Sequence, residues 1–262
     1  MKTVSTCAVC GNNTRQYPAT IDPWVINRML SGHTENLPKC YLNHCGICNY
    51  AGINYRFSRD EENIYYKDYM KPGGDYVNQR GIHDIAEYYD SEYNKKMRRD
   101  MAWSVLDKYI DYSQILSIVD YGGNTGEMIP HELSCATCYV VEVEPRVLPN
   151  GVRAVASSGE LDPVDLVMCS HTLEHVSDIA LVIEDIKTYM RPGSWFYIEV
   201  PYEQNKDFGA GYGFHEHINL YTPKCLESLM AKYGFTVNPV EVLNYTGNMT
   251  RSIAIIGQLK GN

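Results

Sequence analysis

The sequence lacks any long apolar run, and it lacks an excess of basic residues. No stretch approaches the roughly 18 consecutive apolar residues that a spanning helix needs, so we expect no transmembrane helix. The first residues, MKTVSTCAVCGNN, contain no apolar signal-peptide core, which favours a cytoplasmic location. Lysine and arginine total 23 against 32 aspartate and glutamate, whereas nucleic-acid binding needs clustered positive charge. We therefore expect neither a nucleic acid nor a membrane as partner.

Two residue types, cysteine and tyrosine, are unevenly distributed along the 262 residues. Five of the nine cysteines lie in the first 48 residues, and 12 of the 22 tyrosines lie between positions 41 and 112. A chain of this length accommodates one large domain with a smaller one, since domains commonly have about 100–200 residues. We predict a small module over residues 1–70 and a larger domain over residues 71–262, with KPGGD at 71–75 as a linker or loop. The sequence leaves the oligomeric state open.

From about residue 115 onward, short β-branched runs alternate with helical patterns. Apolar residues recur at helical spacing over 178–190 and 222–235, where Thr222 is placed to cap the second helix and Gly234 to end it. This alternation predicts an α/β fold with a doubly wound parallel sheet. Two strand-like runs at the tail follow each other without a helix, which predicts an antiparallel hairpin closing the sheet edge. The expected strands span 115–121, 139–144, 152–157, 164–170, 194–201, 235–245 and 251–260.

A glycine-rich turn follows the first of these strands, in the segment IVDYGGNTG. Glycines there let the backbone approach a ligand at the start of the next helix, where N–H groups are free. The dinucleotide-binding pattern G-x-G-x-x-G is not met, because its second and third glycines would be Asn124 and Glu127. An acid two residues before the first glycine suits a cationic ligand such as S-adenosylmethionine better than a pyrophosphate. The candidate ligand-binding residues of this turn are Asp120, Gly122, Gly123 and Gly126.

A carboxylate at the end of the second expected strand is a further candidate for cofactor binding. Glu144 lies 24 residues after Asp120, and an acid in this position can accept hydrogen bonds from both ribose hydroxyls of a nucleotide cofactor. Glu142 lies two residues earlier on the same expected face and is the weaker alternative. The competing interpretation is a tight β–α turn without a ligand, followed by a surface acid.

Besides VDYGGNTG, the chain contains EVEP and the longer stretch SHTLEHVSDIALVIEDIKTYMRPGSWFYIEVP. Together these segments, in a likeness that covers most of the chain, resemble class I S-adenosylmethionine-dependent methyltransferases. The chain departs from the family pattern at Asn124 and Ser194, where glycine is usual. The resemblance implies a Rossmann-like sheet of seven strands with an antiparallel terminal strand, and S-adenosylmethionine as cofactor. It also implies that His171 lies near the cofactor, whereas Glu174 and His175 are more often structural.

A second polar segment, FHEHINLYT, follows a glycine-rich stretch. Methyl transfer needs a positioned acceptor and removal of its proton, and histidine is a suitable base at neutral pH. The segment is similar to one in sugar C-methyltransferases with an N-terminal zinc module, which implies that Glu216 and His217 face the sugar. We predict catalytic roles for both, with His217 as the general base, and a purely structural histidine is the alternative. Tyr66, Tyr69 or Tyr93 are expected to line the substrate cleft.

Two C-x-x-C knuckles lie in the N-terminal part of the chain, and each is followed by a residue that tolerates positive φ. Four thiolates suit a closed tetrahedral zinc site, which is structural because no position remains for water. Cys40 and His44 are spare candidates, and an iron–sulfur cluster or a redox pair is the alternative to zinc. The similar sugar methyltransferases carry such a module. The predicted zinc ligands are Cys7, Cys10, Cys45 and Cys48.

These features predict methyl transfer from S-adenosylmethionine to a small polar acceptor, namely a nucleotide-linked sugar or a precursor of a surface glycan or natural product. One alternative is a nicotinamide-dependent enzyme acting on nucleotide sugars, against which the unmet glycine pattern argues. Another is a non-catalytic zinc-containing binding protein on a degenerate methyltransferase fold, which the missing middle glycine favours. The sequence specifies neither the acceptor atom (carbon, oxygen or nitrogen) nor the pathway.

Overall fold

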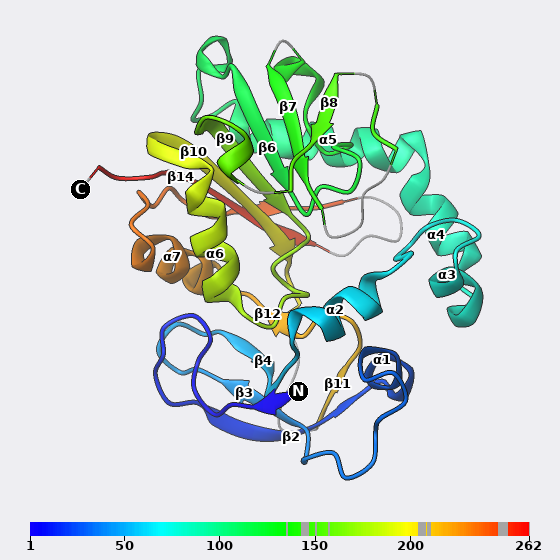
Figure 1. Cartoon of the computed structure of the whole chain (residues 1–262). Helices are drawn as coiled ribbons and strands as arrows, with labels where there is room; N and C mark the ends of the chain where they lie inside the picture. Colours follow the sequence, from blue (N-terminus) through cyan, green and yellow to red (C-terminus); the bar gives the residue numbers. More distant parts are fainter. Residues whose placement is uncertain are drawn as a thin grey trace.

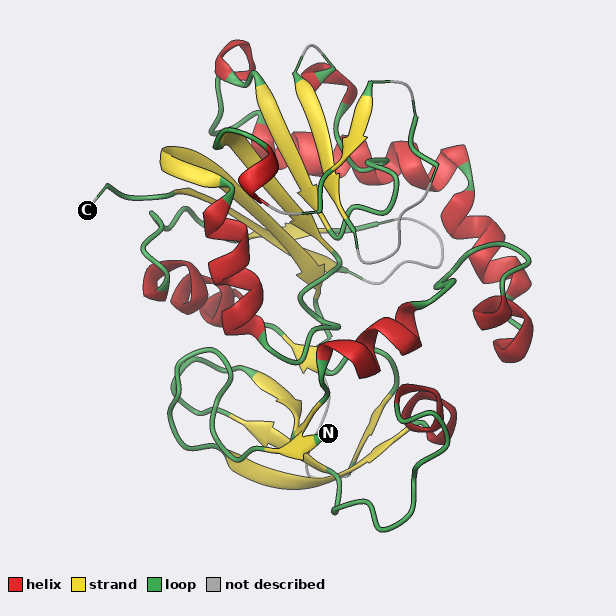
Figure 2. Cartoon of the chain, viewed as in Figure 1, coloured by secondary structure: helices red, strands yellow, loops and turns green. Residues whose placement is uncertain are grey.

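A computed structural model gives the structure of the chain. The described residues form a large sheet flanked by helices, a small sheet near the N-terminus and a separate pair of short strands (Figure 1). The helix α2 (Arg59–Tyr66) lies between the large sheet and the small sheet (Figures 1 and 2). In the described part of the chain, no helix is long and apolar enough to cross a membrane. The structure describes residues 1–134, 136–142, 147–149, 151–156, 158–203, 208, 211–245 and 251–261.

The large sheet has seven strands and is mainly parallel. They are β6 (Ser117–Tyr121), β7 (Thr137–Val141), β8 (Val152–Ala154), β9 (Val164–Ser170), β10 (Met190–Pro201), β13 (Glu241–Leu243) and β14 (Ser252–Gln258). Their order is β13-β14-β10-β9-β6-β7-β8. The five strands from β10 to β8 are parallel neighbours, so their carboxyl ends meet at one edge. The predicted α/β fold with a seven-stranded sheet is confirmed.

The last strand in the sequence, β14, is antiparallel to its neighbours. It pairs with β10 from Trp195 opposite Gln258 to Pro201 opposite Ser252. On its other side it pairs with β13, which forms the edge of the sheet. The hairpin predicted for the tail is therefore present, but β13 rather than β14 closes the sheet. Alternate residues of β14 enter the cores on the two faces of the sheet, so its first six residues are all buried.

Helices cover both faces of the large sheet because alternate residues of a strand point to opposite sides. In β6, Val119 joins the core formed with α6 (Ile179–Thr188) and α7 (Pro223–Lys232). Its neighbour Ile118 joins the core formed with α5 (Glu92–Leu106). Figure 1 shows α6 and α7 in front of the sheet and α5 behind it. The sheet is thus covered on both sides, as its apolar strands require.

Local capping residues set the bounds of α7 as the sequence predicts. The Thr222 side chain accepts a hydrogen bond from the backbone N–H of Cys225, and Gly234 follows the helix with a φ of +85°. The remaining helices precede the strands of the large sheet in the sequence, whereas two of the three short 3-10 segments lie between those strands. These helices are α1 (Pro23–Met29), α3 (Asp75–Arg80) and α4 (His83–Asp90), with 3-10 segments at Tyr112–Gln114, His131–Leu133 and Ser158–Glu160.

The small sheet combines strands from both ends of the chain. Its strands are β2 (Arg15–Ile21), β3 (Tyr41–His44), β4 (Ala51–Ile53), β11 (Tyr212–Phe214) and β12 (Asn219–Leu220), in the order β11-β2-β3-β4-β12. A separate antiparallel pair joins β1 (Lys2–Thr3) to β5 (Tyr55–Arg56). Strands on both sides of residue 70 thus enter one sheet, and the boundary placed there stays a prediction.

Asn219 of β12 ties the small sheet to the turn that follows β9. Its side chain is 1% exposed. The amide nitrogen donates to the backbone oxygens of Leu173 (2.9 Å) and Val176 (2.7 Å), and the amide oxygen accepts from the hydroxyl of Tyr50. Leu173 and Tyr50 are buried and Val176 is half-buried, so the amide links the two sheets by pairing polar groups that are largely withdrawn from water.

We expect the change Asn219→Ala to lower the free energy of unfolding by about 3 kcal/mol, because it removes three hydrogen bonds at roughly 1 kcal/mol each, those to the carbonyls of Leu173 and Val176 and the one from the Tyr50 hydroxyl. Urea-induced unfolding followed by circular dichroism measures the change. The control is Asn27→Ala on the exposed side of α1, where we expect a change within about 0.5 kcal/mol. Equal stabilities of the two variants would contradict the role given to Asn219.

Candidate functional site

A cavity of about 1070 Å³ opens at the carboxyl ends of the parallel strands. Its lining comes from the turn after β6, the turn after β9, the region of α2, and the segment before β12. Ligands of open α/β sheets bind at this edge, so this cavity is the candidate site. The residues of the predicted site that line it are Gly122, Gly123, His171, Glu216 and His217.

The glycine turn packs so closely that side chains are excluded at two of its positions. Gly122 has a φ of +70°, and a Cβ atom there would lie 2.4 Å from Oγ1 of Thr172. A Cβ atom on Gly123 would lie 2.2 Å from the carboxyl carbon of Asp120. Both glycines therefore let the backbone run over the Asp120 carboxylate and against the turn after β9.

The rest of the turn is shaped by positive backbone angles and by Glu142. Asn124 has a φ of +56°, and its backbone N–H donates to the Glu142 carboxylate at 2.9 Å. Gly126, with a φ of +78°, faces Val140 of the sheet rather than the cavity. Glu142, the weaker alternative, lines the cavity and holds the glycine turn. The predicted ribose ligand Glu144 lies outside the described residues.

Asp120 is a buried carboxylate without a hydrogen-bond partner among the described residues. It is 1% exposed, and neither of its oxygens accepts a hydrogen bond. Burial raises its pKa to about 7, while Arg98 lowers it and Glu142 and Glu127 add to the rise. A buried, unpartnered carboxylate costs free energy, so its position directly beneath the glycine turn fits a ligand that brings a hydrogen-bond donor or a positive charge.

Arg98 is a cavity residue that the sequence interpretation missed. It lies on α5 and lines the cavity, and its Nε is buried without a hydrogen-bond partner among the described residues. The positive charge of Arg98 acts to lower the pKa values of both Asp120 and His171, and other effects outweigh it at each residue. Adjacent arginines at 98 and 99 in a predominantly polar helix were the available signal, but they lie outside every motif that carried the sequence argument.

His171 follows β9 and lies between two buried carboxylates. Its Nε2 is 2.9 Å from Glu199 and its Nδ1 is 3.3 Å from Glu174. Burial and Arg98 oppose protonation, yet hydrogen bonds to both carboxylates raise the pKa of His171. Its backbone has a φ of +52°, an uncommon value for a residue with a side chain. The structure therefore places His171 in the cavity wall between two carboxylates, and its predicted place near the cofactor stays a prediction.

The predicted base His217 is paired with a carboxylate that the sequence interpretation missed. Its Nδ1 lies 3.0 Å from Oε2 of Glu203, which follows β10. Burial alone would lower the pKa of His217, but Glu203 and the nearby Glu174 and Glu216 raise it to about 9. The ring of His175 lies 4.8 Å away, centroid to centroid. In the unliganded protein, His217 is therefore mostly protonated at neutral pH.

Glu216 and His217 both reach the cavity, but their immediate partners differ. The Glu216 carboxylate accepts a hydrogen bond from the Tyr76 hydroxyl at 2.7 Å. Its backbone oxygen accepts one from Nδ1 of His175 at 3.2 Å, and burial lowers the pKa of His175. The preceding His215 has a side chain that is 74% exposed. The segment thus presents one acid and one histidine to the cavity and leaves the other histidine at the surface.

Two of the three tyrosines expected at the cleft line the cavity. The rings of Tyr66 and Tyr69 contact His175 at centroid distances of 5.4 Å and 5.9 Å. The Tyr66 hydroxyl is buried without a hydrogen-bond partner among the described residues. Tyr93 is 62% exposed and is not a lining residue. The cavity therefore has an aromatic wall with one unpartnered hydroxyl beside the histidine pair.

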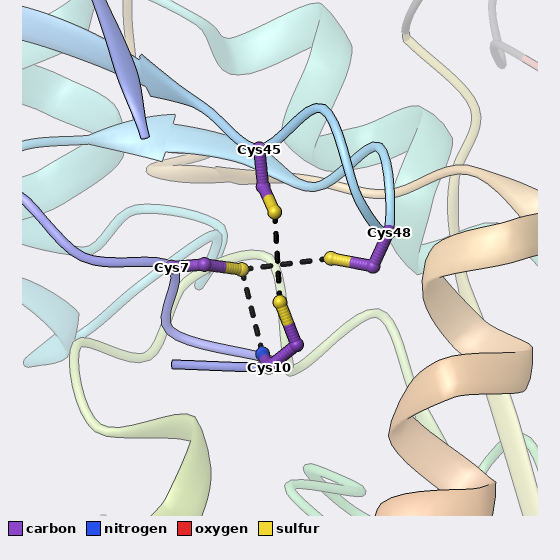
Figure 3. A group of neighbouring side chains, drawn as sticks. All are labelled: Cys7, Cys10, Cys45 and Cys48. Carbon is purple, nitrogen blue, oxygen red and sulfur yellow. Dashed lines mark hydrogen bonds between the residues drawn. The ribbon is translucent and has the colours of Figure 1, made fainter. Parts of the chain in front are cut away.

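Away from the cavity, the two cysteine knuckles converge on one point (Figure 3). The sulfur atoms of Cys7 and Cys48 are 3.5 Å apart, as are those of Cys10 and Cys45. A tetrahedral zinc ion with bonds of about 2.3 Å separates its sulfurs by roughly 3.8 Å. The four thiols, all mutually within 4.8 Å, therefore fit a zinc ion in number, chemistry and spacing.

The spare candidates Cys40 and His44 lie outside this group of four. Cys40 packs against a separate hydrophobic core, which contains Leu42 and Ile53 of the small sheet. The ring of His44 contacts the rings of Tyr17 and Phe208. The cysteine group itself belongs to the core that contains Cys225 of α7. The knuckles are thus packed against the large domain rather than held apart from it.

The family model of the methyltransferase domain matches residues 69–240, and a search of curated proteins gives no match. Among solved structures, the 1,6-didemethyltoxoflavin-N1-methyltransferase of Burkholderia thailandensis aligns with a TM-score of 0.54 and 12% identity, over 86% of this chain and 98% of that one. The mitomycin 7-O-methyltransferase aligns with a TM-score of 0.48 and 15% identity, over 71% of this chain and 61% of its own. At 12% identity, the likeness to the Burkholderia thailandensis enzyme shows the fold alone.

Proposed function

The chain belongs to the methyltransferase domain family and is an S-adenosylmethionine-dependent methyltransferase, and from this premise we propose that it methylates a nucleotide-linked sugar or a related small polar precursor. One observation carries the proposal. A single cavity is lined both by the glycine turn over the unpartnered Asp120 carboxylate and by His217, a histidine paired with a carboxylate. The glycine turn that covers the carboxylate and the candidate base therefore line the same space.

The residues around the glycine turn fit S-adenosylmethionine, which when bound supplies a methyl group on a positively charged sulfonium. Asp120 would accept hydrogen bonds from the amino group of the methionine part, and these would satisfy its two unpartnered oxygens. Arg98, whose Nε is also unpartnered, would pair with the methionine carboxylate. Gly122 and Gly123 would let the backbone approach the cofactor. The ribose role of Glu144 stays a prediction.

The wall of the cavity near His175 supports a sugar as the acceptor. Tyr66 and Tyr69 offer aromatic faces on which the C–H groups of a sugar ring can pack, and Tyr66 adds an unpartnered hydroxyl. Glu216, beside them, offers carboxylate oxygens that accept hydrogen bonds from sugar hydroxyls. An aromatic surface next to a carboxylate therefore suits a compact molecule rich in hydroxyl groups.

His217 would act as the general base in its neutral form. With Nδ1–H donated to Glu203, the lone pair of Nε2 takes the proton from the acceptor atom. S-adenosylmethionine, when bound, would supply the methyl group that replaces this proton and would leave as S-adenosylhomocysteine. Charge on sulfur is lost along this path, so the protein contributes mainly position and proton removal. Glu216 would hold the acceptor beside His217.

We expect His217→Ala to lower turnover by about 10²–10⁴-fold while leaving cofactor affinity unchanged. Because His217 has a pKa of about 9, little of it is neutral at pH 7, and kcat/KM of the wild type should rise about tenfold per pH unit up to about pH 9. Methyl transfer from radiolabelled S-adenosylmethionine to a panel of nucleotide sugars measures both effects. The control is His215→Ala, which changes an exposed histidine two residues earlier in the chain. Unchanged turnover of His217→Ala would remove the residue from the mechanism.

Cofactor binding is expected to depend on the ionisation of Asp120. Its raised pKa of about 7 means that the carboxylate charges as pH rises from 6 to 8, so affinity for S-adenosylhomocysteine should increase over this range. Asp120→Asn should weaken binding about tenfold or more and remove the pH dependence. Calorimetry on both proteins tests this, with the exposed Asp162→Asn as control. A pH-independent wild type, or an unaffected Asp120→Asn, would refute the assignment.

We also propose that the four clustered cysteines hold a structural zinc ion, since they leave no open coordination position. Purified protein should contain about one zinc per chain by plasma mass spectrometry. Cys45→Ser should lose it, because a hydroxyl is a far poorer zinc ligand than a thiolate. Cys40→Ser, outside the group, should retain it. Full zinc content in Cys45→Ser, or iron in place of zinc in the wild type, would overturn this proposal.

A further inference from the structure

Glu203 is a carboxylate at the cavity edge that no sequence motif indicated. It lies two residues after the end of β10, whereas its partner His217 lies just before β12, so two distant parts of the chain bring them together. Oε2 of Glu203 is 3.0 Å from Nδ1 of His217, and the two side chains are 19% and 26% exposed. The pair is therefore largely withdrawn from water.

The contact determines which ring nitrogen of His217 carries the proton in the neutral ring. A carboxylate can only accept, so Nδ1 must carry the proton that it donates to Glu203. In the neutral ring, Nε2 is then the unprotonated nitrogen. A carboxylate in this position also stabilises the imidazolium that forms when Nε2 takes a proton. The geometry thus fixes the tautomer and the orientation that a base at this place needs.

The other charged groups that face His217 are engaged elsewhere. Glu174 contacts His171 at 3.3 Å and His175 at 3.8 Å. The Glu216 carboxylate accepts from Tyr76, and the Nδ1 of His175 binds a backbone oxygen. Glu174 and Glu216 act on His217 through their charge. Among the described residues, the side-chain hydrogen bond of His217 is the one to Glu203. A change at Glu203 therefore removes this direct hydrogen bond together with the charge of its acceptor and leaves Glu174 and Glu216 in place.

We propose that Glu203 is a positioning residue, which acts on the reaction through His217 by holding its Nδ1–H and directing Nε2 toward the acceptor. This inference rests on the proposed role of His217 as the base. Glu203 itself touches neither the acceptor nor the methyl group in this scheme. Removing its charge while keeping its shape should leave ligand binding intact and alter the basicity and the tautomer of the histidine.

The first test follows the His217 ring by NMR in the unliganded full-length protein, with ¹⁵N-labelled histidine and His217→Gln to assign the signal. In Glu203→Gln, the midpoint of the titration should fall by about one pH unit or more from its wild-type value near 9. The nitrogen shifts should also change from a single tautomer to a mixture. Glu227→Gln, an exposed site on α7, removes the same charge and should change neither.

The second test measures methyl transfer against pH. Glu203→Gln should move the rising limb of kcat toward acid pH and lower its plateau about tenfold, with the KM for S-adenosylmethionine unchanged. Glu203→Asp keeps the charge and should restore part of the wild-type profile, and it serves if Glu203→Gln does not fold. An unchanged His217 titration in the variant overturns the proposal. A shifted titration without any change in the pH profile supports the pairing and instead refutes His217 as the base.

Discussion

The buried amide of Asn219 is the interaction on which the arrangement of both sheets depends. It fixes the small sheet, through Tyr50, to the backbone of the turn after β9. The same turn meets the Glu216–Asn219 segment again, because the backbone N–H groups of residues 218 and 219 donate to the carbonyl of Glu174. The cysteine knuckles, the cavity wall and the candidate base are thereby joined in one hydrogen-bonded unit, so the N-terminal module forms part of the site.

Buried charge gives the cavity its chemistry. Glu174 and Glu199 are almost fully buried and hold His171 between them, and neighbouring histidines lower the pKa of Glu174 to about 2 despite its burial. Asp120 has no such partner, and its pKa rises instead. Glu199 accepts hydrogen bonds from the protein, and Glu174 lies beside two histidines, whereas Asp120 has neither a hydrogen-bond donor nor an ion-pair partner among the described residues. This difference separates Glu174 and Glu199 from the acid that we assign to the cofactor.

Sequence periodicity predicted what depends on neighbouring residues, and it failed where distant strands meet. The strands from β6 to β10, the helices α6 and α7 and the cysteine knuckles all follow local patterns, so they could be predicted. The pairing of β11 and β12 with the N-terminal sheet, and the position of β14 inside the large sheet, depend on long-range contacts that no local pattern encodes. Arg98, Glu199 and Glu203 were missed for the same reason, because each becomes significant only beside a partner far away in the chain.

The central claim is that one cavity brings the cofactor and the candidate base face to face. A crystal structure of the protein with S-adenosylhomocysteine tests it most directly. The account predicts that the amino group of the ligand contacts the Asp120 carboxylate beneath the glycine turn and that its sulfur faces the part of the cavity lined by His217. A ligand bound elsewhere, or a sulfur atom turned away from His217, would contradict the account.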